Sequence, residues 1–126
     1  KPLLGRASDA IGRRPLILLG LLLCALAMSC ITFTSEFERL LVLAGIFGFG
    51  DAAIMTASAA LVGDSTEPRF VGSAMGVYGT LLDIGHASGP IMSGVLISSV
   101  GYPAAFLTAG GMLIVAIAYL GITMIT

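Results

Sequence analysis

The chain has 126 residues, of which 57% are hydrophobic and only 10% are charged, and its mean hydropathy is +1.06. This composition excludes a soluble globular domain and indicates that membrane lipid is the solvent for most of the surface. The formal net charge is -1, and no block of Lys or Arg follows the first fourteen residues, which excludes a nucleic-acid partner.

Residues 1–14 form a basic segment ahead of the first long apolar stretch. They contain four of the six Lys and Arg residues of the chain. Cytoplasmic loops of membrane proteins carry an excess of these residues, so we predict a cytoplasmic loop here. Because the chain begins with Lys and Pro and no signal peptide precedes the apolar stretch, we also expect a fragment of a longer protein.

Four membrane-spanning helices are predicted after this loop, at residues 15–35, 40–63, 70–100 and 104–126. The first and the last are uncharged, and each is long enough to cross a hydrocarbon core of about 30 Å. The second carries Asp51 inside the span, but ten Leu, Ile, Val or Phe residues offset the insertion penalty of one carboxylate. The sequence therefore predicts an all-α membrane protein.

The third predicted helix, residues 70–100, is the weakest span of the four. It is rich in glycine and carries both Asp83 and His86, so we expect it to depend on neighbouring helices for its insertion. Pro90 lies inside it and should kink it, because proline removes one backbone hydrogen bond and clashes with the preceding turn.

The distribution of charge also predicts the orientation of the chain in the membrane. With the first loop in the cytoplasm, four crossings place residues 36–39 and the uncharged turn 101–103 outside. Residues 64–69 and both ends of the fragment are then cytoplasmic. We expect an integral, multi-pass protein of the plasma membrane.

The first loop carries a motif made of Gly5, Asp9, Gly12, Arg13 and Arg14. One interpretation is a compact turn that its basic residues hold in the cytoplasm. At these spacings the five residues also resemble the cytoplasmic loop signature of the major facilitator superfamily, which joins the second and third helices and recurs between the eighth and ninth. In that family the acid and the bases form a charge relay with a helix end of the other half. The resemblance implies that Asp9 and Arg13 are gating residues.

A second resemblance lies in the third predicted helix and consists of Gly76, Gly85, Gly89, Pro90 and Gly94. It is similar to the fifth-helix signature of the antiporters of the same family, except that Ser93 stands where the pattern has glycine. Small residues allow two helices to approach closely, so a helix-packing face is the structural interpretation of the motif. The resemblance implies the same role.

Ionisable residues inside the spans are candidates for a transport pathway or for proton coupling. On a helical wheel Asp83 and His86 share one face of the third predicted helix with Gly72, Gly76, Gly79, Pro90 and Ser93. A carboxylate is costly in hydrocarbon, so this face should look onto the bundle interior or a water-filled cavity. The alternative is a hydrogen bond that only fixes the position of the helix. The same two interpretations apply to Asp51.

No catalytic set, metal-ligand cluster or nucleotide-binding loop is present in the sequence. The single His lacks a Ser or Cys partner at a readable spacing, and the glycine-rich stretches lie inside apolar spans rather than between a strand and a helix. We expect neither enzymatic activity nor a cofactor or bound metal.

The family resemblance implies a part of a twelve-helix bundle that transports a small organic solute or drug by alternating access. Proton-coupled efflux is the expected mode, and the expected partners are lipid, the remaining helices, the solute and protons. The missing intramembrane Arg before Gly48-Phe49-Gly50 favours helices nine to twelve of the C-terminal half, whereas the glycine motif favours the N-terminal half. Two alternatives stay open: a four-helix exporter that acts as a dimer, although its first span would need an acid, and a membrane scaffold that does not transport.

Overall fold

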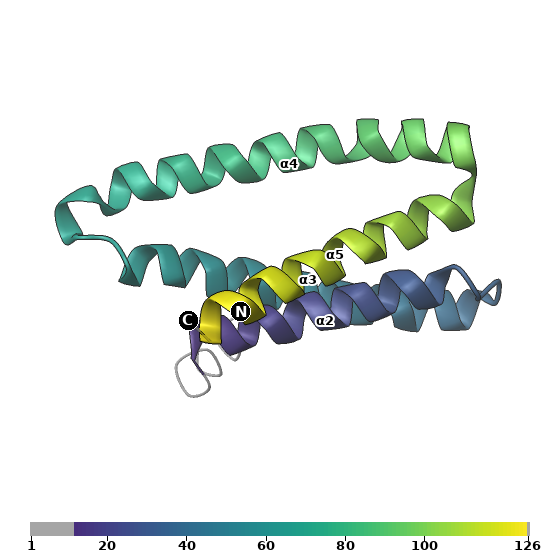
Figure 1. Cartoon of the computed structure of the whole chain (residues 1–126), viewed down its shortest axis with the longest axis horizontal. Helices are drawn as coiled ribbons and strands as arrows, with labels where there is room; N and C mark the ends of the chain where they lie inside the picture. Colours follow the sequence, from purple (N-terminus) through teal and green to yellow (C-terminus); the bar gives the residue numbers. More distant parts are fainter. Residues whose placement is uncertain (1–11, 126) are drawn as a thin grey trace.

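The computed structural model describes residues 12–125, with side chains described up to residue 123, as an all-helical chain (Figure 1). Within this range the elements are α2 (Arg13–Ile31), α3 (Phe37–Asp64), the short 3-10 helix η1 (Pro68–Phe70), α4 (Val71–Val100) and α5 (Tyr102–Ile125). The four α-helices follow one another through short connections, so that successive helices run in opposite directions (Figure 1). Gly5 and Asp9 of the loop motif lie outside the described residues.

The helices begin and end a few residues away from the bounds expected from the sequence. α2 already begins at Arg13, because basic side chains at a helix end can reach the polar interface, and it ends in a turn in which Phe33 N–H donates to the Cys30 carbonyl at 3.1 Å. α5 includes Pro103, because a proline is tolerated in the first turn of a helix. Only Gly101 separates α4 from α5, and its φ of 83° suits glycine.

α2 is the central helix of the described bundle and packs against both α3 and α5. The core between these three helices consists of Leu16, Ile17, Leu21, Ala53 and Ala57, with partly buried residues of α5 packed against it. Alanine and glycine at these positions bring the helix axes close together, as is common between helices in membranes. Gly20 of α2 and Gly50 of α3 lie at a close approach of these two helices.

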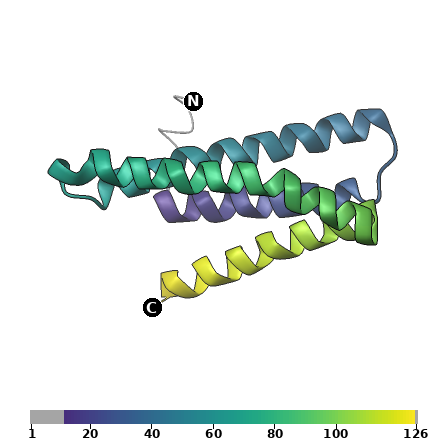
Figure 2. The ribbon, with the colours of Figure 1, turned by 90° about the horizontal axis from the view of Figure 1, so that it is seen from above.

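α4 stands apart from this three-helix core, and none of its residues is buried. Figure 1 shows α4 along one side of the molecule, joined to the core through the connections at its two ends, and Figure 2 shows it changing direction in the C-terminal half that contains Pro90. The Tyr78 and Ser58 hydroxyls form a 2.6 Å hydrogen bond that ties α4 to α3. The helix is therefore held by few contacts within the described residues.

Three of the described helices are long and apolar enough to cross a membrane, judged by length and composition: Arg13–Ile31, Phe37–Asp64 and Tyr102–Thr123. α4 is long enough at 30 residues but is not in this group. Its ionisable residues and glycines lower its hydropathy. That α4 also spans the membrane stays a prediction.

Candidate functional site

A crevice lies between α4 and the core made by α2, α3 and α5. Three cavities of about 530, 290 and 240 Å³ adjoin there, since all three share Ala109 as a lining residue. We refer to them together as the central crevice. Its lining comes from all four helices: Cys24 and Met28; Phe47, Asp51 and Ile54; Gly85, Gly89, Met92, Ser93, Leu96 and Ile97; Ala105, Phe106, Ala109, Met112 and Leu113.

Asp51 is the one acid that lines the central crevice. Its position follows from the preceding residue, because Gly50 is buried against α2 and thereby fixes the rotation of α3. Within the described residues the Asp51 carboxylate has no hydrogen bond and no ion pair. The neighbouring Cys24 thiol donates instead to the Phe47 carbonyl at 3.6 Å. Asp51 is itself exposed.

Asp83 and His86 do not line this crevice, and both are exposed on α4. At about 100° per residue, Asp83 lies about 120° around the helix from the centre of the crevice-lining face, and His86 about 60°. No hydrogen bond or ion pair joins the two side chains in the described structure. Neither residue therefore lines the crevice together with Asp51, and their role in a pathway stays a prediction.

Only part of the glycine motif of α4 lines the central crevice. Gly85 and Gly89 line the central crevice. A Cβ atom added to Gly76, Gly85, Gly89 or Gly94 would meet nothing within 4 Å in the described structure. Pro90 is exposed. A packing partner for this face would have to come from outside the described residues, so the packing role also stays a prediction.

At the opposite end of the α2–α3 pair from the hairpin turn, the loop motif meets α3. Arg13 Nε donates to Asp64 Oδ2 at 2.8 Å, and the Arg13 side chain is 26% exposed. Gly12 precedes the helix with a φ of 98°, and Arg14 is exposed. The bond joins the first residue of α2 to the last of α3.

The ion pair with Arg13 makes Asp64 a candidate functional residue that the sequence analysis did not identify. The sequence analysis places Asp64 in the cytoplasmic segment 64–69 and assigns no role to it. A usable signal was present, because in an antiparallel helix pair the start of one helix and the end of the next lie at the same membrane face. Opposite charges at those two places can meet.

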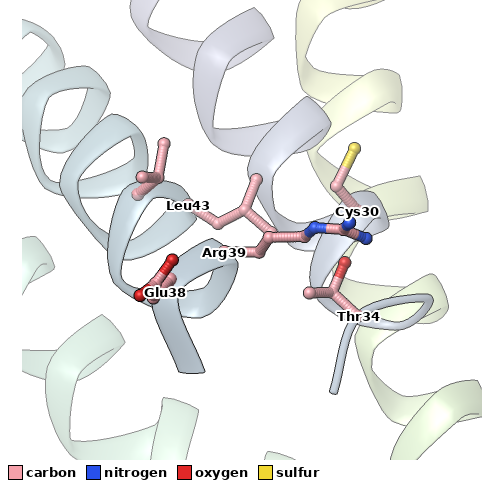
Figure 3. A pocket seen from close by; sticks show the side chains of 6 residues that line it. Cys30, Thr34, Glu38, Arg39 and Leu43 are labelled. Carbon is pink, nitrogen blue, oxygen red and sulfur yellow. The ribbon is translucent and has the colours of Figure 1, made fainter. Parts of the chain in front are cut away.

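A hollow of about 410 Å³ lies at the other end of this helix pair (Figure 3). Figure 3 shows the Arg39 side chain reaching from the start of α3 toward Cys30 at the end of α2. Arg39 Nε pairs with Glu36 Oε2 at 2.9 Å, and both side chains are exposed. No group of three or more His, Cys, Asp or Glu residues that could hold a metal ion occurs among the residues that the structure describes.

Comparison with known proteins identifies the family. The model of the Major Facilitator Superfamily matches residues 1–125. Citrate exporter 1 of Aspergillus niger is 29% identical over 116 residues, which cover 90% of this chain and 22% of the relative. The uncharacterized MFS-type transporter YybF of Bacillus subtilis is 32% identical over 112 residues, or 89% of this chain and 28% of the relative.

The multidrug resistance protein MdtG of Salmonella arizonae is 28% identical over 113 residues, which cover 90% of this chain and 28% of the relative. The chain therefore spans about a quarter of the length of the curated relatives that it matches. No solved structure matches the chain significantly.

Proposed function

This chain belongs to the Major Facilitator Superfamily, and we propose that it supplies one wall of the solute pathway in a secondary active transporter. The family consists of transporters rather than enzymes, and its members are integral, multi-pass membrane proteins. The observation that carries the proposal is the position of Asp51, an exposed acid that lines a crevice between four helices and has no hydrogen bond or ion pair in the described part of the chain. An acid at membrane depth marks a pathway or a coupling site by default.

The proposed mechanism is alternating access, in which two halves of a helix bundle rock around a site near the middle of the membrane. The four helices would correspond to helices nine to twelve, and the remaining helices would close the pathway opposite the crevice. The loose attachment of α4 supports this arrangement, since a helix with no buried residue has surface left for those helices. Arg13, with Asp64, would form part of the cytoplasmic gate.

We further propose that transport is export of a small organic solute and that a proton gradient drives it. Two relatives are named an exporter and a multidrug resistance protein, which supports this direction. Asp51 would take part from the crevice, and Asp83 and His86 from the exposed face of α4. Acidic and histidine side chains inside membrane spans are typical of proton relays. The expected location is the plasma membrane, with both ends of this chain in the cytoplasm.

Proton-driven flux in proteoliposomes tests the proposal, with the natural protein at full length and a panel of cationic, neutral and anionic solutes. We expect a pH gradient to drive the accumulation of at least one solute, and Asp83→Asn or His86→Gln to change the pH dependence of that flux. Glu38→Gln is the matched control, because it removes an exposed charge of α3 outside the crevice.

Two results would contradict the proposal. Flux that never exceeds that of empty liposomes for any solute would favour the scaffold alternative. An unchanged pH dependence in both variants would leave Asp83 and His86 only a packing role.

A further inference from the structure

The Ser58 and Tyr78 hydroxyls lie on the helix faces that line the central crevice. On α3 the lining residues Asp51 and Ile54 are followed at helical spacing by Ser58, four residues after Ile54. On α4 Tyr78 is seven residues, or about two turns, before the lining residue Gly85 and therefore lies on the same face. The hydrogen bond between the two hydroxyls thus connects the two faces that enclose the crevice.

This bond lies at the end of the crevice that is nearest to η1, the connection between α3 and α4. At 1.5 Å per residue, Ser58 is about 6 Å beyond Ile54 along α3, and Tyr78 is about 10 Å beyond Gly85 along α4. In the predicted orientation this end is the cytoplasmic one. A solute that moves between α3 and α4 from the crevice to the cytoplasm would have to pass the bond.

The contact is made by one hydroxyl of each helix. The Ser58 hydroxyl donates its single proton to the Ile54 carbonyl at 2.6 Å, so the Tyr78 hydroxyl is the donor in the 2.6 Å bond to Ser58 Oγ. Within the described residues this is the one side-chain hydrogen bond that joins α4 to another helix. The nearby Thr80 hydroxyl, in contrast, donates to the Gly76 carbonyl of its own helix at 2.9 Å.

A single bond between neutral hydroxyls suits a contact that opens and closes repeatedly. Its net contribution is small, because water or a polar solute can replace each partner when the bond breaks. α4 has no buried residue, and a Cβ atom at Gly76 or Gly79 would meet nothing within 4 Å in the described structure. These two glycines therefore do not hold α4 against the core next to Tyr78.

From this geometry we infer that the bond between Tyr78 and Ser58 is a gate at the η1 end of the central crevice. It is made while the passage between α3 and α4 is closed and broken while the passage is open. The inference rests on the proposed transport function, because a gate acts only in a pathway. The gate is distinct from the ion pair of Arg13 and Asp64, which joins α2 to α3 and does not involve α4.

Labelling of a reporter cysteine by a membrane-impermeant maleimide tests the inference in the natural protein at full length. Gly85→Cys places the reporter in the crevice, and mass spectrometry of the peptide that contains it gives the labelling rate. Tyr78→Phe or Ser58→Ala should raise this rate about 2 to 13 times from the η1 face of the membrane, the range expected for the loss of one hydrogen bond. The double variant should label no faster, because both changes remove the same bond.

Two controls accompany this experiment. Thr80→Val removes a hydroxyl of α4 that bonds only within its own helix, so the labelling rate of Gly85→Cys should stay unchanged. A second reporter, Ser65→Cys, follows the end of α3 beyond the bond and identifies the η1 face of the membrane. Its labelling rate should be equal in all backgrounds, because the gate does not cover it.

Three outcomes would overturn the inference. Equal labelling of Gly85→Cys with and without Tyr78→Phe, in a protein that retains proton-driven flux, would exclude the gate and leave the transport proposal intact. Equal acceleration at Gly85→Cys and Ser65→Cys would show a general loosening of the fold. An additive effect in the double variant would show that the two hydroxyls act separately. Faster labelling of Gly85→Cys alone, in a protein without flux of any solute, would support the closure of the crevice by this bond and contradict the transport proposal.

Discussion

Gly20 of α2 and Gly50 of α3 approach each other so closely that neither can carry a side chain without a shift of the backbone. A Cβ atom on Gly20 would lie 2.7 Å from the Gly50 carbonyl oxygen, and a Cβ atom on Gly50 would lie 2.8 Å from the Gly20 carbonyl oxygen. Both contacts are with backbone atoms, which cannot rotate away. Because Asp51 follows Gly50 directly, the same contact sets the direction in which the carboxylate points.

Replacing Gly50 by alanine should therefore destabilise the protein. Overpacking at a close helix contact outweighs the gain in helix propensity, and we expect a net loss of about 1–2 kcal/mol in unfolding free energy. A lower melting temperature of the purified protein reports this loss. Gly48→Ala is the control on the same helix, because a Cβ atom there meets nothing within 4 Å in the described structure. Equal melting temperatures for the two variants would show that the close contact is not formed.

The ion pair between Arg13 and Asp64 should contribute little to the free energy of unfolding. Since the Asp64 side chain is 59% exposed, we expect a coupling free energy of about 0.2–1 kcal/mol from a double-mutant cycle with Arg13→Ala and Asp64→Ala. The coupling should shrink when salt is added, because exposed charges are screened. The pair of Glu36 and Arg39, in which both side chains are at least 66% exposed, should couple less. A coupling free energy of zero at low salt would show that Arg13 does not interact with Asp64.

The hydrogen bond between the Ser58 and Tyr78 hydroxyls should limit the local opening of α4. Tyr78→Phe removes a hydrogen bond worth about 0.5–1.5 kcal/mol, so we expect amide hydrogen exchange in α4 to become about 2 to 13 times faster. Tyr119→Phe is the control, because its exposed hydroxyl makes no hydrogen bond in the described structure. If both variants exchange alike, other contacts hold α4 in place.

The predicted orientation can be tested with Cys30, the exposed one of the two cysteines in the chain. Cys30 is exposed at the end of α2 that should face outward, whereas Ser65 follows the end of α3 that should face the cytoplasm. In intact cells a membrane-impermeant maleimide should label Cys30, and a cysteine at Ser65→Cys only after the membrane is opened. The reverse pattern would invert the whole topology.

The helices themselves could be predicted from the sequence, because long apolar runs in lipid have few other ways to satisfy their backbone. Their packing could not be predicted in the same way. α2 is apolar on every side, so its pattern does not distinguish the buried Leu16 and Ile17 from the exposed Leu19 and Leu22. Amphipathicity, the usual signal for a buried face, is weak when lipid surrounds the protein.

The candidate site was only partly accessible to sequence reasoning. Asp51 could be singled out because an acid inside an apolar run is rare. A helical wheel places Asp83 and His86 on one face of α4, but it does not say what that face meets. The approach of α4 to Cys24 and Met28 depends on contacts distant in sequence, and nothing in the local pattern indicates it.

The weak hydropathy of α4 bears on how the chain enters the membrane during synthesis. A translocon that admits helices one at a time according to their apolarity would favour α5 over α4. Because one glycine joins the two, we expect them to insert as a single hairpin, with the later segment drawing in the earlier one. A ribosome stalled before α5 emerges would then leave α4 at the aqueous side of the bilayer.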